Sequence, residues 1–317
     1  MRFYLGIDTS NYTTSLCLMS DTGELAADVR QVLSVAQGER GLRQSEAVFQ
    51  HIRNLPVLTK QLQPFLTNGN EIVAVGVSAK PRPQPDSYMP VFLPGYGLAL
   101  SLANLGNIPY YELTHQENHI WSGIKTAGGP VVNRFLAIHL SGGTTELCSV
   151  FRDEQFRFSI KVLGGTTDLH AGQFVDRIGV ALGLPFPAGK HLEKLALQTT
   201  SQVTVPSFHR EGKVSFSGPM TALLRHIDTA SPSEIARGCF TAISRSLVKW
   251  IRWAGEQTEC RDLLIVGGVA SNSIIREHLL EKMPEWNIFF AEPSFSTDNA
   301  YGAAFYAGLA HGSFHLD

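Results

Sequence analysis

Two histidines four residues apart are the first feature of this sequence with a clear use in chemistry. His115 and His119 lie in the segment THQENHIW. On a helix, residues at this spacing project from one face, so both imidazole rings can bind one metal ion. Thr114 and Glu117 have the spacing of a capping box, which predicts that the helix begins at Thr114. Both histidines then lie in the first turns, where the helix dipole favours the neutral ring that binds metal.

The spacing alone leaves open that these are two unrelated histidines, because no third ligand lies nearby in the sequence. Glu117 does not stand in the HExxH position, so the segment lacks the pattern of a zinc-dependent peptidase. The four cysteines are far apart and form no CxxC pair, which gives neither a zinc knuckle nor a disulfide framework. We therefore expect reduced cysteines and a reducing compartment.

Glycines and hydroxyl groups gather in a second segment, SGGTT at residues 141–145. The glycines permit positive φ and expose backbone N–H groups beside three hydroxyls, which suits a phosphate or a carboxylate. No Gly-Lys-Ser/Thr follows, so this is not a Walker A loop, and a plain hairpin turn is the alternative. Residues 267–272 follow an apolar run and open a helix, as a nucleotide-binding turn does. A tight turn capped by Ser271 or Asn272 has the same pattern.

The glycine segment belongs to an internal repeat. Residues 5–17, LGIDTSNYTTSLC, and residues 136–148, LAIHLSGGTTELC, agree at seven of thirteen positions when displaced by 131 residues. Each copy has a short apolar run, a polar turn and an alternating run, which predicts a β-hairpin with small residues at its tip. Because an internal repeat indicates two related domains, we expect two similar halves.

After each hairpin, helices and strands are expected to alternate. In the first half, hydrophobic periodicity predicts a strand at 24–33, a helix at 45–65, a buried strand at 72–77, a helix at 96–105 and a strand at 110–113. Prolines at positions 81, 83, 85, 90 and 94 predict a loop over residues 80–94.

The second half predicts a similar order with more helix. Its expected elements are a strand at 156–162, a sharp turn at Gly164-Gly165, a helix at 168–182, a mostly helical segment at 190–260 interrupted by a strand-like segment at 213–217 and by Ser231-Pro232, a strand at 263–266, a helix from 272, a strand at 287–291 and a helix of small residues at 298–310.

Three-stranded meanders followed by alternating helices and strands, present twice, predict an α/β protein. We expect two duplicated lobes of the actin, sugar-kinase and Hsp70-like ATPase type with a central cleft. In such folds the two hairpin tips face each other across the cleft and hold phosphates. The first lobe is predicted at residues 1–113 and the second at 114–317, with a helical insertion at 190–260 and a C-terminal helix that can return to the first lobe.

Composition limits the classes of protein that this sequence fits. With 317 residues, 44% of them apolar, the chain is long enough for two hydrophobic cores. The formal net charge of −2 gives no global basic field, so any nucleic acid must be held by a local patch or by another subunit. The longest apolar run, residues 93–105, falls short of the roughly 20 residues of a membrane span. No signal-peptide pattern is present, and we expect a cytoplasmic protein that does not enter a membrane.

These residues together resemble the universal tRNA threonylcarbamoyladenosine-forming transferase family, once described as O-sialoglycoprotein endopeptidase. The similarity runs nearly end to end. His115 and His119 match the family's HxxxH motif, residues 139–144 stand at its SGGHT hairpin, and SFSG at 215–218 is also a family string. The resemblance implies transfer of a threonylcarbamoyl group from its adenylate to adenosine 37 of tRNA, with the exocyclic amine as nucleophile and a metal that polarises the carbonyl.

The resemblance also assigns ligands to residues. It implies one divalent metal, Fe or Zn, bound by His115, His119 and Asp298. It implies ATP or an acyl-adenylate as a second ligand. The residues matched to nucleotide contacts are Ser141, Gly142, Gly143, Thr144, Asp176, Gly189 and Asn272. Without the resemblance, Asp176 and Asp298 would pass for ordinary acids on helix surfaces.

The sequence departs from the family pattern at the first hairpin tip. The family's ETSCDET is here residues 8–14, DTSNYTT, so Tyr12 and Thr13 replace an acidic pair. The catalytic residues are left unassigned, with Asp8 and Thr13 as the candidates. Thr144 replaces the histidine of SGGHT, and SFSGLKT has become SFSGPMT. Two hypotheses remain: an active transferase that acts on tRNA, or a catalytically weak or inactive nucleotide-binding paralogue that serves as a partner or regulatory subunit. A homo- or heterodimer through the first lobe is left open.

Overall fold

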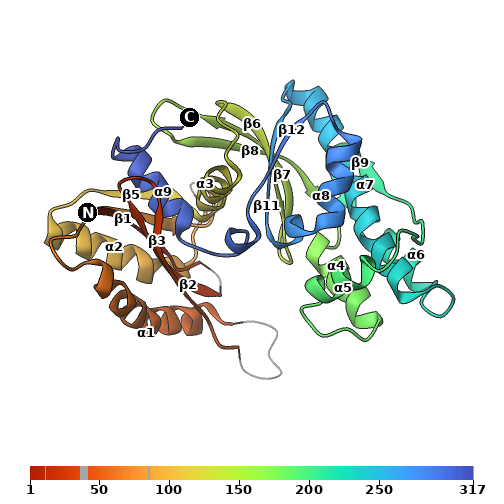
Figure 1. The fold of residues 1–317 in the computed structure, drawn as a ribbon, viewed down its shortest axis with the longest axis horizontal. Coiled ribbons are helices and arrows are strands. Elements are labelled where there is room, and N and C mark those ends of the chain that lie inside the picture. Colours follow the sequence, from red (N-terminus) through yellow and green to blue (C-terminus); the bar gives the residue numbers. More distant parts are fainter. Residues whose placement is uncertain (11, 36–41, 85, 317) are drawn as a thin grey trace. The chain divides into compact units, whose positions relative to one another are not determined.

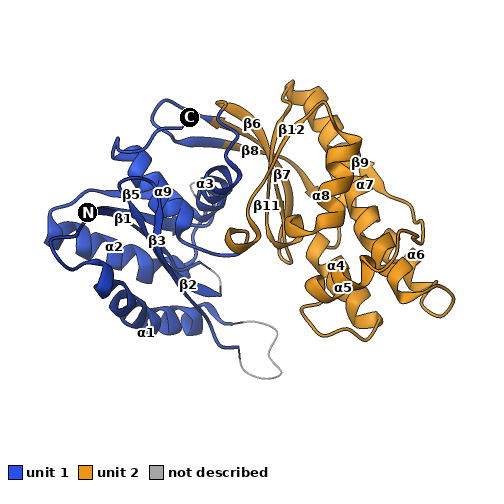
Figure 2. Ribbon diagram, in the orientation of Figure 1, with its two compact units in different colours: residues 1–131, 152–159, 297–317 blue, residues 132–151, 160–296 orange. Residues whose placement is uncertain are grey.

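The computed structural model describes residues 1–10, 12–35, 42–84 and 86–316 (Figure 1). Its contacts divide the chain into two compact units (Figure 2). Unit 1 comprises Met1–Val131, Arg152–Ser159 and Thr297–Asp317, and unit 2 comprises Val132–Phe151 and Ile160–Ser296. This division differs from the predicted boundary after Leu113, because helix α3 (His115–Ala127) packs against helix α9 (Tyr301–Ala310) within unit 1.

Unit 1 is built on a five-stranded sheet in the order β3-β2-β1-β4-β5. Strand β1 is parallel to β4, and β4 is parallel to β5, whereas β2 runs antiparallel to both β1 and β3. The strands are β1 (Arg2–Asp8), β2 (Thr13–Ser20), β3 (Leu25–Val32), β4 (Glu71–Lys80) and β5 (Tyr110–Thr114), and the remaining helices are α1 (Gln44–Leu62) and α2 (Leu93–Gly106).

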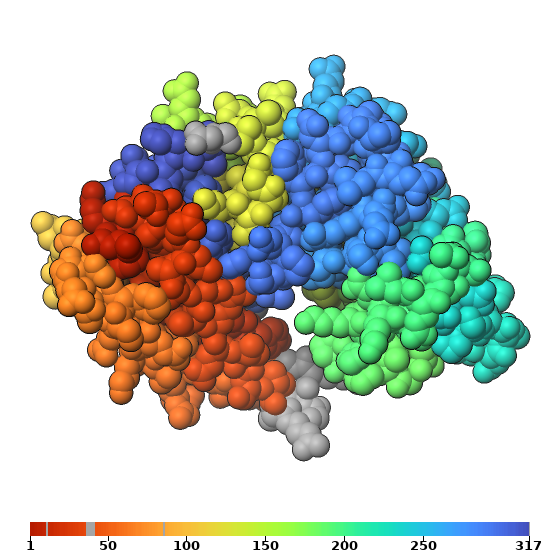
Figure 3. Space-filling view, in the orientation of Figure 1, coloured from red at the N-terminus to blue at the C-terminus, as the bar shows by residue number. Residues whose placement is uncertain are grey.

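Unit 2 is built on a seven-stranded sheet in the order β12-β11-β6-β7-β8-β10-β9. Its strands are β6 (Arg134–Leu140), β7 (Thr145–Arg152), β8 (Phe158–Thr166), β9 (Phe208–Arg210), β10 (Lys213–Ser215), β11 (Asp262–Val266) and β12 (Asn287–Phe290). Its helices are α4 (Ala171–Ala181), α5 (Gly189–Ala196), α6 (Ser217–Leu224), α7 (Pro232–Thr258) and α8 (Ser273–Lys282). Helix α8 lies at the surface of unit 2 (Figure 3).

The internal repeat has a direct structural counterpart. Ile7 pairs with Leu16 in the first hairpin, and Ile138 pairs with Leu147 in the second, so both hairpins have the same register. The strand order β3-β2-β1-β4-β5 of unit 1 recurs in unit 2 as β8-β7-β6-β11-β12, to which β10 and β9 are added at one edge. The predicted duplicated α/β architecture is therefore confirmed.

Two local predictions were wrong. Gly164-Gly165 is not a turn, because β8 continues to Thr166 and pairs with β10 there. A side chain at Gly164 would place its Cβ 1.8 Å from the carbonyl oxygen of Gly212, so glycine allows this close approach. Residues 80–94 are not all loop, because a 3-10 turn covers Pro90–Phe92 and α2 begins at Leu93. Proline is tolerated there because the first turn of a helix needs no N–H donor from it.

The two faces of the unit 1 sheet bury different partners. Leu5, Ile7 and Val75 share a core with residues of α1 and α2. On the opposite face, Gly6 and Gly76 are register partners in β1 and β4, and both lie against α9. A Cβ at Gly6 would lie 2.1 Å from the carbonyl oxygen of Ala300, and one at Gly76 would lie 2.0 Å from that of Ala303. Glycine at these positions therefore lets α9 lie directly on the sheet. In the described part of the chain, no helix has the length and apolar character to span a bilayer.

Candidate functional site

The helix that carries the two histidines begins as predicted. Thr114 caps α3, and its hydroxyl accepts a hydrogen bond from the backbone N–H of Glu117 at 3.2 Å. The Glu117 carboxylate in turn accepts from the backbone N–H of Thr114 at 2.7 Å. The capping box is confirmed, and it fixes His115 as the first residue of α3.

A carboxylate from the far end of the chain joins the histidines within unit 1. The Nε2 atoms of His115 and His119 lie 3.1 Å apart, and each lies 3.5 Å from Oδ1 of Asp298. Asp298 lies just before α9, whose contact with α3 brings these residues together. Two imidazoles and a carboxylate whose ligand atoms all lie within 4.8 Å of one another form a donor set that suits Zn²⁺ or Fe²⁺.

Asp8 lies behind the first histidine and is fully buried at the end of β1. Its Oδ2 lies 3.0 Å from Nδ1 of His115 and accepts hydrogen bonds from Ser78 at 2.5 Å and from the side-chain amide of Asn118 at 3.1 Å. Its Oδ1 accepts from the backbone N–H of Ser10 at 2.8 Å and from the Ser10 hydroxyl. A carboxylate held in this way fixes the ring orientation of His115 and directs its Nε2 toward His119 and Asp298. Asp8 is therefore buried against His115 and is not exposed to solvent.

The charges of this cluster stabilise one another. Burial opposes ionisation of Asp8, Asp298 and His115, but the interactions among these groups outweigh the effect of burial. The charge and hydrogen bond of His115, with the hydrogen bonds from Ser10 and Ser78, hold the pKa of Asp8 below its usual value. The pKa of Asp298 is lowered by hydrogen bonds from His115 and His119 and by their charge. Asp8 and Asp298 together raise the pKa of His115 to about 10, so these carboxylates favour the charged ring, contrary to the neutral ring that the helix dipole predicted.

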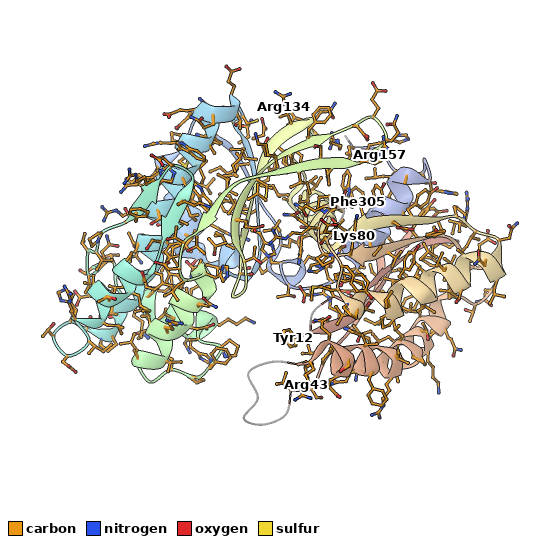
Figure 4. The ribbon with its side chains drawn as sticks, turned by 180° about the vertical axis from the view of Figure 1, so that it is seen from behind. Tyr12, Arg43, Lys80, Arg134, Arg157 and Phe305 are labelled. Atoms are coloured by element: carbon orange, nitrogen blue, oxygen red, sulfur yellow. The ribbon has the colours of Figure 1, made fainter. Side chains whose placement is uncertain are left out.

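The other catalytic candidate, Thr13, and its neighbour Tyr12 belong to the first hairpin. Tyr12 is labelled in Figure 4, and its side chain is 43% exposed. Thr13 begins β2 and is half-buried, with its backbone N–H 3.3 Å from the carbonyl oxygen of Ser10. Asn11 lies outside the described residues. Neither of the two described side chains at the positions of the family's acidic pair is a carboxylate.

In unit 2, the second hairpin tip packs on the start of a helix. The Ser141 hydroxyl accepts hydrogen bonds from the N–H groups of Gly143 and Thr144 at 3.3 and 3.0 Å. The carbonyl of Ser141 accepts from the N–H of Gly172 at 3.0 Å. A Cβ at Gly172 would lie 2.7 Å from the Cα of Gly142. The close contact between the hairpin tip and α4 therefore requires glycine at position 172, in the helix. Gly142 and Gly143 have φ outside the left-handed region, and a Cβ on either would meet no atom within 4 Å.

Hydrogen bonds link the other predicted nucleotide contacts. Asp176 accepts from the backbone N–H of Ala188 at 2.8 Å and so fixes the residue before Gly189, where α5 begins. Glu193 of α5 accepts from the backbone N–H of Ser273 at 2.7 Å, at the start of α8. Asn272 caps α8 by accepting from the N–H of Ile275 at 3.0 Å.

Asn272 also has a donor that the described residues do not satisfy. Its side chain is 4% exposed, and its Nδ2 has no hydrogen-bond partner among them. Buried amide donors normally find an acceptor, so this group favours a bound ligand with an acceptor atom. The helix-capping turn that was the alternative prediction is present. It uses only the side-chain oxygen of Asn272 and leaves Nδ2 for such a contact.

Asp168 is a residue that the sequence did not single out. It accepts hydrogen bonds from the hydroxyls of Ser215 and Ser217 and from the N–H of Phe216 at 2.9 Å, just before α6. These bonds outweigh partial burial and lower its pKa.

We expect Asp168→Asn to destabilise unit 2 by about 1 kcal/mol, since hydrogen bonds to a partly exposed charge are worth little more than this. The folded-state pKa lies below the unfolded value, so the stabilisation is present at neutral pH and declines as pH falls below about 4. Urea unfolding from pH 3 to 7 checks this. A difference between wild type and variant that grows toward low pH would contradict it.

Solved structures with the same fold are divergent in sequence. The ADPNP-bound activator of 2-hydroxyisocaproyl-CoA dehydratase from Clostridium difficile matches with a TM-score of 0.55 and 14% identity, over 98% of this chain and 96% of that chain. HypF from T. kodakarensis matches with a TM-score of 0.59 and 15% identity, over 98% of this chain and 48% of that one. A ROK family glucokinase from Streptomyces griseus, in complex with glucose and AMPPNP, matches with a TM-score of 0.54 and 10% identity, over 96% of this chain and 99% of that chain. With its two sheets of like topology, the chain is a two-lobed protein of the actin, sugar-kinase and Hsp70-like ATPase fold.

Comparison of the sequence with family profiles identifies the family of this chain. The profile of tRNA N6-adenosine threonylcarbamoyltransferase matches residues 34–305. The chain belongs to this family, as its resemblance indicated.

Proposed function

We propose that this protein binds one divalent metal in unit 1 and an adenine nucleotide in unit 2, and that it transfers a threonylcarbamoyl group from its adenylate to an adenosine of tRNA. The observation that carries the proposal is the cluster of His115, His119 and Asp298, with Asp8 behind it. Family membership supports the reaction. A tRNA substrate is consistent with a cytoplasmic protein.

The metal ligands are His115, His119 and Asp298 in this proposal. A bound Fe or Zn ion supplies Lewis-acid polarisation of a carbonyl or phosphoryl oxygen. The protein's own contribution is orientation, because Asp8 binds Nδ1 of His115 and leaves Nε2 for the cluster.

The nucleotide is assigned to the second hairpin tip and its neighbours. Ser141, Gly142, Gly143 and Thr144 offer backbone N–H groups and hydroxyls for phosphate. The buried, unpaired Nδ2 of Asn272 offers a donor, and Asp176 and Gly189 shape the turn beside it. Two structures of the same fold hold ADPNP or AMPPNP, which supports an adenine nucleotide as the ligand.

The reaction requires one bond to form and one to break. The exocyclic amine of adenosine forms a C–N bond with the threonylcarbamoyl carbonyl carbon and gives up one proton. The bond from that carbon to the phosphate oxygen breaks, and AMP leaves with the electron pair. Binding both ligands in fixed orientations lowers the entropic part of the barrier.

The observation that favours a second function is the first hairpin tip. Tyr12, 43% exposed, and Thr13 stand where the family has acids, so this chain lacks two carboxylates that a transferase would offer. A catalytically weak or inactive paralogue would bind the nucleotide and act as a partner or regulatory subunit.

One experiment separates the two functions. The protein is expressed in a strain depleted of its own threonylcarbamoyltransferase, and modified adenosine is measured in bulk tRNA. Restored modification supports the transferase. Failure of a well-expressed protein that still binds ATP by calorimetry would reject the transferase and leave the paralogue.

We expect Asp8→Asn to weaken metal binding by about 10- to 100-fold, as the loss of a carboxylate behind a metal-binding histidine usually does. An asparagine amide would also present N–H donors where Asp8 now accepts from Ser10, Ser78 and Asn118. Zinc affinity measured against a competing chelator checks this. Asp21→Asn removes an equal charge from the exposed surface of unit 1 and is expected to leave the affinity unchanged. Equal affinities for wild type and Asp8→Asn would show that Asp8 does not position the ligand.

A further inference from the structure

Unit 2 contains a cavity of about 970 Å³ that none of the proposed ligands uses. It is lined by the β9–β10 hairpin, by α6 and by Thr167 before α4. We call it the hairpin groove, and its lining includes Phe208, Arg210, Lys213, Ser217, Thr221 and Arg225. Its volume lies at the upper end of the roughly 300–1,000 Å³ range of small-ligand sites, so it has room for more than one nucleotide.

The hairpin groove is cationic within a chain whose net charge is −2. Arg210, Lys213 and Arg225 face a single acid, Glu211, among its lining residues. Arg210 and Glu211 lie 3.7 Å apart but are 75% and 82% exposed, so their ion pair contributes little. In the portion of the chain described here, Lys213 and Arg225 take part in no ion pair.

The backbone places two of these cations side by side. Arg210 and Lys213 are direct partners across the hairpin. The turn between them, Glu211-Gly212, has φ of 48° and 77°, as in a type I′ turn, which fixes this pairing. Like charges directly opposite in an antiparallel pair destabilise the hairpin. A bound anion would remove that repulsion.

An aromatic ring and hydroxyl groups complete the lining. Phe208 is 42% exposed although it is a large apolar side chain. Thr167, Ser215, Ser217 and Thr221 also line the groove. The start of α6 is already occupied by the Asp168 carboxylate, so an anion in the groove would be held by side chains rather than by the helix terminus.

We propose that the hairpin groove binds a single-stranded segment of RNA. Its phosphates lie against Arg210, Lys213 and Arg225, and one unstacked base lies on the ring of Phe208. Cations that follow a backbone beside an exposed aromatic ring are how proteins hold single strands. This inference deepens the proposed function, because it names the local patch that a weakly acidic chain needs in order to hold tRNA.

The first test reverses the paired charges. Binding of a short, fluorescein-labelled single-stranded RNA to the full chain is followed by anisotropy at several salt concentrations. Arg210→Glu with Lys213→Glu is expected to weaken binding at least 10-fold and to reduce the slope of log affinity against log salt by about 1.4. The control, Arg134→Glu with Lys161→Glu, makes the same charge change at exposed residues of unit 2 outside the groove lining, and Arg134 is labelled in Figure 4. Equal losses in both double variants would overturn the proposal.

The second test concerns the ring. Phe208→Ala is expected to weaken single-strand binding by roughly 5-fold or more and to leave duplex RNA binding unchanged, because only an unstacked base can lie on the ring. Phe151→Ala removes another exposed phenylalanine of unit 2 and should change neither. Tighter binding of duplex than of single strand by wild type would overturn the proposal, as would an unchanged Phe208→Ala.

A third measurement separates a binding role from a structural one. Arg210→Glu replaces a repulsive pair with an attractive one, so the variant should be at least as stable as wild type in urea while its RNA affinity falls. A parallel loss of stability and affinity would mean that the residue maintains the fold, and would overturn the proposal. Zinc and ATP affinities should be unchanged in all groove variants. A groove variant that loses RNA binding but keeps zinc and ATP binding supports the groove. Absence of zinc or ATP binding by the wild-type protein contradicts the proposed function, whatever the result for RNA.

Discussion

His115→Ala is expected to lower the affinity for a divalent metal by roughly 10²- to 10³-fold. Structural zinc sites with four ligands contribute about 10–16 kcal/mol, so one ligand contributes about 2.5–4 kcal/mol. The variant should remain folded, because Asp8 keeps the hydrogen bonds from Ser10, Ser78 and Asn118 when the imidazole is removed. Metal content of the purified protein by mass spectrometry and zinc affinity by competition give the result.

The controls distinguish loss of a ligand from loss of a histidine. His226→Ala removes an exposed imidazole in unit 2 and should leave the metal content unchanged. Asp298→Asn keeps the size of the third ligand and removes its charge, and it should lower the affinity without a change in far-UV circular dichroism. If His115→Ala and Asp298→Asn both retain metal at the wild-type level, the cluster is not a metal site.

Gly76→Ala is expected to destabilise unit 1 by about 3 kcal/mol or more. The added Cβ would lie 2.0 Å from the carbonyl oxygen and 2.7 Å from the carbonyl carbon of Ala303, and backbone atoms of a helix cannot move away as a flexible side chain would. Overpacking of a core usually costs about 1–3 kcal/mol, and a contact with backbone belongs at the upper end. Urea unfolding measures the change.

A glycine-to-alanine substitution in α2 should not destabilise unit 1. A Cβ at Gly97 in α2 would meet no atom within 4 Å, and alanine is favoured over glycine in a helix by about 1 kcal/mol. Gly97→Ala should therefore leave the stability unchanged or raise it. Gly76→Ala should also lower the metal affinity, because displacement of α9 moves Asp298. If both alanine variants are as stable as wild type, α9 does not depend on the close contact.

The sequence was most informative where local patterns repeat. The shared letters of residues 5–17 and 136–148 predicted two hairpins, and Ile7–Leu16 and Ile138–Leu147 have the same register because burial on one sheet face fixes it. A C-terminal helix that can return to the first lobe was predicted, but the boundary was placed before α3, whose packing against α9 no local pattern shows. Gly164-Gly165 was misread because glycine permits both a turn and a close approach of two strands.

The candidate sites show the same division between local and long-range information. The helical spacing of His115 and His119 could be read directly, whereas Asp298 came only from family resemblance, because no local pattern links residues so far apart in the sequence. Asp8 was a catalytic candidate, and its buried contact with His115 depends on the pairing of β1 with β4 and of β4 with β5, which leads into α3. Asn118 was missed, although its position three residues after His115 places it on the same helix face.

The hairpin groove was missed for a related reason. Only residues 213–217 were predicted as strand, and the Glu211-Gly212 turn was overlooked, although a glycine flanked by alternating residues is a hairpin signal. Its opposing cations become visible only when the register is known.

The return of the chain to unit 1 has a consequence for synthesis on the ribosome. Residues 297–310 emerge after all of unit 2, so the nascent first unit has strands and α3 but no α9 to cover Gly6 and Gly76. Because domains generally fold as units during synthesis, unit 2 can finish folding before the earlier-made unit does. Asp298 therefore joins the two histidines only after unit 2 has been translated, and a ribosome that stalls inside unit 2 releases a product without Asp298.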